Sequence, residues 1–129
     1  MKKIFAIFLL LTSTSFAVNS AELKFICYQD INECDTIADM AKSWEASSGH
    51  TLNIETVGYE VIREQLENQL ESGAAPDLAR VTNLGGLNKF YLDLKPYIDA
   101  TYWEQNYGAT LPWYRKPSGD DGIYGWQTQ

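Results

Sequence analysis

The positions of apolar side chains along the first two thirds of the chain predict three short strands. Residues 23–28 and 78–81 are mostly apolar runs, which are typical of strands buried on both faces of a parallel sheet. Between them, residues 51–57 place Leu52 and Ile54 on one face of a third strand. We therefore expect three strands that are separated by longer connections.

The apolar residues of both connections between the strands have the spacing of a helix. In the first, Asp35 is a suitable N-cap and Gly49 stands where a helix commonly ends. The apolar positions of this helix, which we interpret as core-facing, are Ile37, Met40, Ala41 and Trp44. The second connection predicts a helix over residues 60–72 that ends at Gly73. Its apolar positions, four residues apart, are Ile62, Leu66 and Leu70.

A third helix is expected over residues 84–90, with Asn83 as its cap, and a short helix near residues 103–107. Residues 116–122 form a turn cluster and are followed by a strand-like apolar run. The alternation of strand and helix predicts an α/β fold, with a mainly parallel sheet, right-handed crossovers and helices on both faces.

The amino end has the pattern of a secretion signal. Two lysines precede an apolar run over residues 4–11, which is short for a membrane span and is followed by small residues. We predict a signal peptide over residues 1–20, cut before Ala21, with Ala17 at a competing site; an uncleaved anchor helix is the alternative. The domain then spans residues 21–129, and its expected location is the periplasm.

Composition and charge narrow the class of protein. The chain is 45% hydrophobic and 13% aromatic, which is typical of a folded domain. Its net charge is −7, and removal of Lys2 and Lys3 with the signal brings it to −9. Such a surface disfavours nucleic acid and anionic lipid as partners. The acidity also fits solubility alone and identifies no ligand.

Ligands of parallel α/β sheets bind outside the carboxyl ends of the strands. The candidate binding residues at those ends are Tyr28, Gln29 and Asp30 after the first strand, Tyr59 and Glu60 after the second, and Asn83 after the third. Amides and carboxylates bridge hydroxyl groups, and aromatic rings stack on apolar faces, so this set suits a sugar. Helix capping by Glu60 and Asn83, and ordinary half-buried tyrosines, remain the simpler alternatives.

No catalytic, metal or cofactor motif stands out. His50 is the only histidine, and we interpret it as a solvated loop residue. The sequence has neither a Cys-x-x-Cys pair nor a phosphate-binding glycine loop. The glutamates of residues 60–71 have the spacing of an exposed helix face, and a hydrolase pair needs a defined separation that a sequence does not give. We therefore expect a binding protein without metal or cofactor, and no enzyme.

Cys27 and Cys34 are the two cysteines of the chain. In an oxidising compartment such a pair commonly forms a disulfide, which would close the loop between the first strand and the first helix. The alternatives are two free thiols, or a partner elsewhere. A bridge would hold residues 28–30 in place before a ligand binds.

Residues 59–98 carry a further signal. An amphipathic helix, a Ser-Gly break, an Ala-Pro-Asp that opens a strand, and a second helical segment follow one another there. This passage resembles the first lobe of family 1 extracellular solute-binding proteins, the receptors of ABC sugar importers. Residues 93–98 resemble a short family segment that ends in tyrosine, and residues 122–127 resemble its Gly-x-Ile-Tyr-Gly motif. In that motif Trp126 stands where an aliphatic residue is common, and it adds an aromatic candidate at the cleft.

The resemblance implies a periplasmic receptor that binds a sugar or oligosaccharide between two lobes and delivers it to ABC permease subunits, as a monomer. Family members are much longer, and the chain ends within an apolar run, so we expect an amino-terminal fragment that reaches the first crossover between lobes. Two other readings are a secreted glycoside hydrolase, and a receptor for a polyamine or amino acid in which Asp30 and Glu60 meet a cation.

Overall fold

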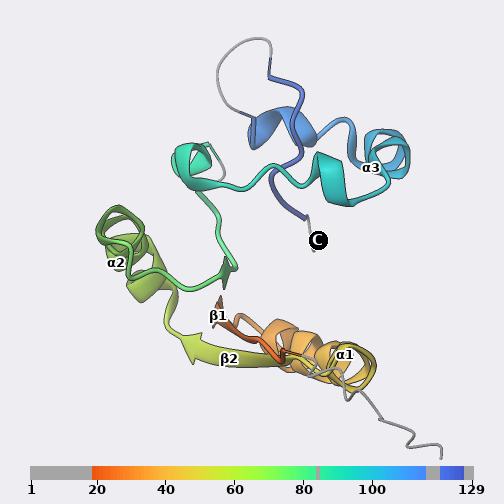
Figure 1. Ribbon diagram of the computed structural model, residues 1–129. Helices are drawn as coiled ribbons and strands as arrows, with labels where there is room; N and C mark the ends of the chain where they lie inside the picture. Colours follow the sequence, from red (N-terminus) through yellow and green to blue (C-terminus); the bar gives the residue numbers. More distant parts are fainter. Residues whose placement is uncertain (1–18, 84, 116–119, 127–129) are drawn as a thin grey trace, which may run out of the picture.

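The three predicted strands form one parallel sheet in the computed structural model, which describes residues 19–83, 85–115 and 120–126. The strands are β1 (Glu22–Tyr28), β2 (Thr51–Val57) and β3 (Leu78–Ala79), in the order β2-β1-β3 (Figure 1). Phe25 of β1 is opposite Ile54 of β2 on one side and opposite Leu78 of β3 on the other. The first strand in sequence is therefore the central strand of the sheet.

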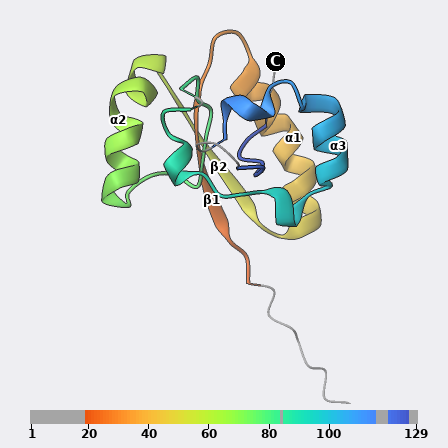
Figure 2. The ribbon, with the colours of Figure 1, turned by 90° about the horizontal axis from the view of Figure 1, so that it is seen from above.

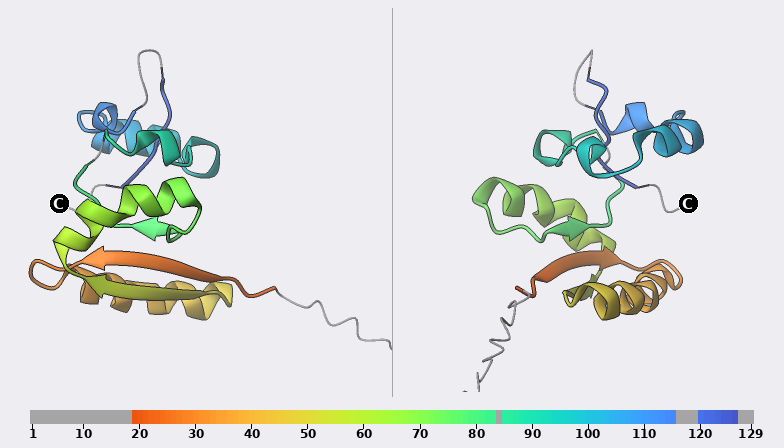
Figure 3. Two further views of the ribbon diagram at one scale, coloured as in Figure 1. Left: turned by 90° about the vertical axis from the view of Figure 1, so that its left-hand side faces the viewer. Right: turned by 45° about the vertical axis from the view of Figure 1, so that its right-hand side comes forward.

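Two helices cover the sheet, one on each face. Helix α1 (Glu33–Ser48) joins β1 to β2, and α2 (Tyr59–Ser72) leads from β2 to β3. Because β2 and β3 flank β1 on opposite sides, the two crossovers place their helices on opposite faces, as Figure 3 shows. Ile62 and Leu66 of α2 are buried in the main core. The predicted α/β fold, with a parallel sheet and helices on both faces, is confirmed.

Both predicted helix ends are confirmed at glycines. Gly49 and Gly73 follow α1 and α2 with φ angles of 71° and 72°, a left-handed conformation that glycine adopts without steric cost. The prediction of Asp35 as the N-cap of α1 is wrong, because the helix begins at Glu33, with Asn32 in the cap position. The backbone N–H of Asp35 is instead bonded to the side chain of Gln29.

The predicted core stripe of α1 is wrong in two of its four positions. Met40 is 68% exposed and Trp44 is 37% exposed, whereas Ile37 and Ala41 are half-buried. Helix α1 faces the sheet with the buried Cys34 and with small side chains, and Leu52 of β2 donates a backbone hydrogen bond to Glu45. This orientation of the helix leaves Met40 and Trp44 outside the core.

His50 is also placed differently from its expected solvated position. It is half-buried, its ring centroid lies 5.7 Å from that of Trp44, and its Nδ1 accepts a hydrogen bond of 3.0 Å from the backbone of Ala21. The histidine therefore ties the start of β1 to the turn that precedes β2.

The expected helix over residues 84–90 does not form in the described residues. Leu84 lies outside them; residues 85–87 make a turn, and a short 3-10 helix, η1, spans Asn88–Phe90. The two glycines at 85 and 86 disfavour a helix. The side chain of Asn83 accepts a hydrogen bond of 3.1 Å from the backbone of Gly86, so it closes this turn and caps no helix.

A second, smaller core lies beyond this turn. It contains α3 (Ala100–Tyr107), the 3-10 helices η2 (Lys95–Tyr97) and η3 (Leu111–Trp113), and the segment 120–126. Trp103, Leu111 and Ile123 are its buried residues. Helix α3 includes the short helix expected near residues 103–107 and begins at Ala100, where Asp99 accepts a hydrogen bond from the backbone of Tyr102.

The segment 120–126 returns to the chain before η2. The backbone of Leu94 donates to the carbonyl of Ile123 at 2.7 Å, and the Asp93 carboxylate accepts from the backbone of Ile123 at 3.0 Å. Figure 1 and Figure 2 show this segment close to α3, in agreement with the burial of Ile123 beside Trp103 and Leu111. Residues 1–18, most of the expected signal peptide, and residues 116–119 of the turn cluster lie outside the described residues. Among the helices that are described, none is both long and apolar enough to cross a membrane.

Candidate functional site

The carboxyl ends of the three strands meet at one edge of the sheet, because the strands are parallel and in register. Residues 29–33 leave this edge from β1, α2 begins there one residue after β2, and residues 80–83 leave it from β3. Six of the seven candidate binding residues lie at this edge. Tyr28 is the last residue of β1, and five others are in the three segments that leave the edge. The exception is Trp126.

Tyr28 lies at the centre of this edge. Its side chain is buried, and its ring meets that of Tyr59 edge to face, with 5.2 Å between the centroids. The guanidinium carbon of Arg80 lies 4.0 Å from the same ring centroid. Burial raises the pKa of the Tyr28 phenol, and the positive charge of Arg80 opposes that rise.

Arg80 is the one buried charged residue among the described residues, and the sequence analysis missed it as a site residue. Its Nη1 donates to the carbonyl oxygen of Tyr28 at 2.6 Å. Its Nη2 lies 3.3 Å from a carboxylate oxygen of Asp30 and 3.6 Å from one of Glu33. The available signal was a charged residue at the end of an otherwise apolar strand, which requires a partner when the strand is buried.

The loop after β1 is held by its own polar side chains. Gln29 exchanges two hydrogen bonds with Asp35, one with its side chain and one with its backbone. Glu33 accepts hydrogen bonds from the backbone of Asp30 at 3.1 Å and of Ile31 at 3.0 Å. These backbone donors lower the pKa of the Glu33 carboxyl, and Arg80 adds to the effect. Of the candidates in this loop, Gln29 therefore supports the backbone, and Asp30 presents an exposed carboxylate.

Cys27 and Cys34 stand at the two ends of this loop, and both are buried. The structure places their sulfur atoms 2.07 Å apart, joined as a disulfide across the base of the loop. The bridge and the Arg80 ion pairs constrain the same short segment from two sides.

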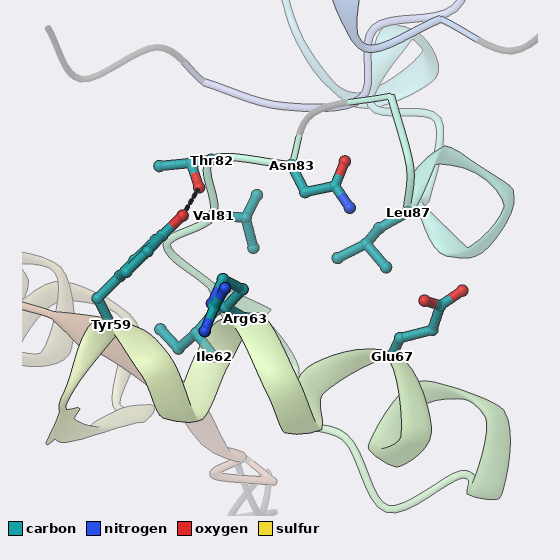
Figure 4. Close-up of a pocket in the computed structure, with 8 residues that line it drawn as sticks. All are labelled: Tyr59, Ile62, Arg63, Glu67, Val81, Thr82, Asn83 and Leu87. Atoms are coloured by element: carbon teal, nitrogen blue, oxygen red, sulfur yellow. Dashed lines mark hydrogen bonds between the residues drawn. The ribbon is translucent and has the colours of Figure 1, made fainter.

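A pocket opens between the start of α2 and the segment after β3 (Figure 4). Its volume is about 70 Å³. Ile62, Val81 and Leu87 supply its apolar surface, and the polar residues around it are Tyr59, Arg63, Glu67, Thr82 and Asn83. The hydroxyl groups of Tyr59 and Thr82 lie 3.1 Å apart and share a hydrogen bond. Two of the predicted residues, Tyr59 and Asn83, are thus brought together at one pocket.

Each of two cations near the pocket faces two carboxylates. Glu60 forms an ion pair with Arg63, and Arg63 also lies 2.9 Å from Glu64. Further along α2, Lys89 lies 3.4 Å from Glu67, which also lines the pocket, and 3.1 Å from Glu71. Glu60 does not line the pocket, and its carboxylate is directed to Arg63.

Trp126 is not among the residues that line this pocket. Its ring meets that of Trp103 edge to face, with a centroid distance of 5.1 Å and an interplanar angle of 89°, and its side chain is 63% exposed. It therefore lies on the surface of the second core, against Trp103. A second hollow, an open groove of about 630 Å³, lies on the α2 side of β1 and β2 and extends as far as Val57, the last residue of β2. Within the described part of the chain, no group of His, Cys, Asp and Glu side chains is arranged to hold a metal ion.

Comparison with known proteins supports the fold. No protein-family model matches the sequence, and no curated protein sequence matches it significantly. The structure is similar to a periplasmic solute-binding protein of Pectobacterium atrosepticum, with a TM-score of 0.61 and 20% identity over 81% of this chain. It is also similar to an ABC substrate-binding protein of Listeria monocytogenes solved with cycloalternan, with a TM-score of 0.56 and 20% identity over 79% of this chain.

This chain spans about a quarter of each of those structures, namely 26% of the first and 28% of the second. At this level of identity the likeness shows a shared fold. The described domain therefore has the fold of one portion of a solute-binding protein.

Proposed function

We propose that this chain forms the amino-terminal lobe of a secreted solute-binding receptor, and that its strand edge is one wall of a cleft for a sugar or oligosaccharide. The observation that carries the proposal is the pocket at the carboxyl ends of the strands, where Tyr59, Thr82 and Asn83 surround an apolar floor. This is the edge at which open α/β sheets bind their ligands.

The lining of the pocket matches the two kinds of surface that a sugar presents. The hydroxyl groups of Tyr59 and Thr82 and the amide of Asn83 can exchange hydrogen bonds with sugar hydroxyls. Ile62, Val81 and Leu87 offer an apolar contact for the C–H face of a ring. The exposed fraction of Tyr59, 42%, leaves ring surface available to a ligand.

The size of the pocket supports a cleft with two walls. A volume of about 70 Å³ is well below the several hundred Å³ of a typical small-molecule site. The structural neighbours are almost four times as long as the matched region, and the proposal assigns the second wall to a second lobe of that kind. Closure of two lobes would then bury the ligand.

The ion pairs do not remove the negative charge of this edge. Asp30 lies 3.3 Å from Arg80 and Glu60 is paired with Arg63, but each arginine also faces a glutamate, Glu33 or Glu64, so a cationic ligand is the alternative that the binding experiment must separate from a sugar. A glycosidase role would require a carboxyl group of raised pKa as general acid. The pKa of Glu33, the most constrained carboxyl at this edge, is lowered instead.

The same proposal implies further partners. A receptor of this kind would act in the periplasm as a monomer and pass its ligand to ABC permease subunits. The Listeria neighbour was solved with cycloalternan, which makes cycloalternan and linear malto-oligosaccharides the first ligands to test.

Calorimetry of the full-length protein tests the proposal. We expect binding of cycloalternan or maltotriose, and no comparable binding of spermidine or glucuronate. Asn83→Ala and Thr82→Val should weaken sugar binding by roughly 5- to 100-fold, since each removes a polar partner at the pocket. Asn68→Ala, on the exposed face of α2, is the matched control and should change affinity less than twofold.

Asn83 also closes the turn to Gly86, so its substitution can affect stability as well as ligand contact. Melting temperatures of the variants distinguish these two roles. If Asn83→Ala lowers the melting temperature while affinity persists, its role is structural. Preferential binding of spermidine would replace the carbohydrate proposal with the cationic alternative.

A further inference from the structure

We propose that Arg80 is a positioning residue, which holds the Tyr28 ring and, through it, sets the orientation of Tyr59 at the candidate binding edge. The inference rests on the proposed function only in that this edge is the proposed ligand wall. The contacts that support it are independent of any ligand.

The first support is the degree to which Arg80 is buried and satisfied. Its side chain is only 8% exposed, and a buried guanidinium is costly unless its donors are bonded. One amino group donates to the Tyr28 carbonyl, and the other faces the carboxylates of Asp30 and Glu33. Arg80 thus joins the end of β3 to both ends of the loop after β1.

The second support is a closed circuit of contacts across the three strand ends. The Arg80 guanidinium packs on the face of Tyr28 at 4.0 Å, and Tyr28 packs against Tyr59 at 5.2 Å. The Tyr59 hydroxyl then bonds to Thr82, two residues after Arg80 in the chain. The circuit begins and ends on the same segment, so a change in Arg80 alters the support of Tyr59 without touching the pocket itself.

The third support is the chemistry of the side chain. A planar guanidinium can stack on an aromatic ring while its edges donate to a carbonyl and to carboxylates at once. A lysine at this position would keep the positive charge but would lack the flat surface and the forked donors. Arg80→Lys therefore separates geometry from charge.

The experiment uses the full-length protein with isotope-labelled tyrosine rings, assigned by Tyr28→Phe and Tyr59→Phe. The wild type should show a ring-to-ring cross-peak between Tyr28 and Tyr59, and Arg80→Lys should lose it while circular dichroism remains native. The matched control is Arg115→Lys, because Arg115 also pairs with a carboxylate, Glu104, and with a carbonyl, that of Gly122, but in the second core. That variant should keep the cross-peak.

A second variant covers the case in which Arg80→Lys fails to fold. Tyr28→Leu keeps the arginine and removes the intermediate ring, and it should increase the rate of Tyr59 ring flipping at least tenfold. Retention of native Tyr59 dynamics in Tyr28→Leu, or of the cross-peak in folded Arg80→Lys, would overturn the proposal. Equal loss of the cross-peak in Arg115→Lys would also overturn it, since the effect would then be general loosening.

Sugar-binding measurements on the same variants distinguish failure of this inference from failure of the proposed function. With cycloalternan and maltotriose as probes, Arg80→Lys should bind at least tenfold more weakly than wild type, and Arg115→Lys within twofold of it. If the wild type binds neither sugar, the carbohydrate proposal fails, and the ring contact still decides the role of Arg80. If the wild type binds and the cross-peak is lost without any change in affinity, Arg80 does not position a binding residue.

Discussion

The guanidinium of Arg80 lies over the ring of Tyr28, with 4.0 Å from its central carbon to the ring centroid. The arginine comes from the end of β3 and the tyrosine from the end of β1, so the contact joins neighbouring strands at the edge where the candidate pocket opens. A cation above an aromatic face stabilises the folded state and also acts on the ionisation of the phenol.

Substitution Arg80→Met should raise the pKa of Tyr28 further. Burial already raises that pKa, and Arg80 opposes the rise because its positive charge stabilises the phenolate. Near-ultraviolet titration of the wild type and of Arg80→Met, each compared with its own Tyr28→Phe variant, measures the difference. A lower Tyr28 pKa in Arg80→Met would show that the arginine does not act on the phenol as the structure implies.

Tyr91 should make the protein less stable at high pH. Burial raises the pKa of Tyr91 to about 12, above its unfolded value near 10. The folded state therefore keeps a proton that the unfolded state loses, and its contribution, complete below pH 10, is lost as the pH rises through about 12.

We expect a decrease of about 1–2 kcal/mol in the free energy of unfolding from this group, with allowance for its partial exposure. Urea unfolding from pH 8 to pH 12 should show a smaller alkaline loss in Tyr91→Phe than in the wild type. Tyr97→Phe is the control, because Tyr97 is 74% exposed.

The Glu33 carboxylate should stabilise the fold at neutral pH and cease to do so in acid. Its pKa is lowered below the ordinary 4.5, chiefly by the hydrogen bond from the backbone of Ile31. Its contribution is therefore present above pH 4.5 and is lost as the pH falls through the lower folded pKa. Glu33→Gln should be less stable than the wild type at pH 7, and the difference should disappear as the pH falls through the lowered pKa of Glu33. A constant difference down to pH 2 would contradict this.

Substitution of an exposed apolar residue of α1 and of a buried one of α2 should change the free energy of unfolding by unequal amounts. Met40→Lys should change the free energy of unfolding by less than about 0.5 kcal/mol, because Met40 is 68% exposed. Leu66→Ala on α2 should cost about 2–5 kcal/mol, because Leu66 is only 3% exposed and leaves a cavity in the main core. Denaturant titration of both variants checks this. A cost above 2 kcal/mol for Met40→Lys would restore the core-facing stripe expected from the sequence.

The bridge between Cys27 and Cys34 should contribute about 2–3 kcal/mol to stability, the chain-entropy value for so short a loop. Peptide mapping without reductant should recover the linked pair. The free energy of unfolding of the wild type should differ by that amount with and without reductant. The double variant Cys27→Ala/Cys34→Ala should have the same free energy of unfolding in both conditions. Two alkylatable thiols in the native protein would contradict the bridge.

Features with a local cause were predictable from the sequence. Gly49 and Gly73 end their helices because the left-handed backbone there favours glycine, and this preference is visible in one residue type at one position. The first and third strands were found because they are short apolar runs, and the second because Leu52 and Ile54 alternate with polar residues. The order of strand and helix then left few topologies to consider.

Features with a cause in tertiary packing were not predictable. The spacing of Met40 and Trp44 fits a helix face, but which face meets the sheet depends on Cys34, Glu45 and the neighbouring strand. Asn83 is a good cap in isolation, yet Gly85 and Gly86 disfavour an α-helix directly after it, and only the short 3-10 helix η1 follows. Arg80 becomes a site residue only when β1 and β3 lie side by side, because its partners are about 50 residues earlier in the chain.

The strand order β2-β1-β3 has a consequence for the order of folding. A polypeptide is made from its amino end, and here the strand made first is the central strand, which pairs along both of its sides. One side of β1 has no partner until residues 51–57 have been added, and the other side has none until residues 78–79 follow. Until then the open sides of β1 can pair with another extended chain, and a chaperone that binds extended apolar segments should engage the strand there.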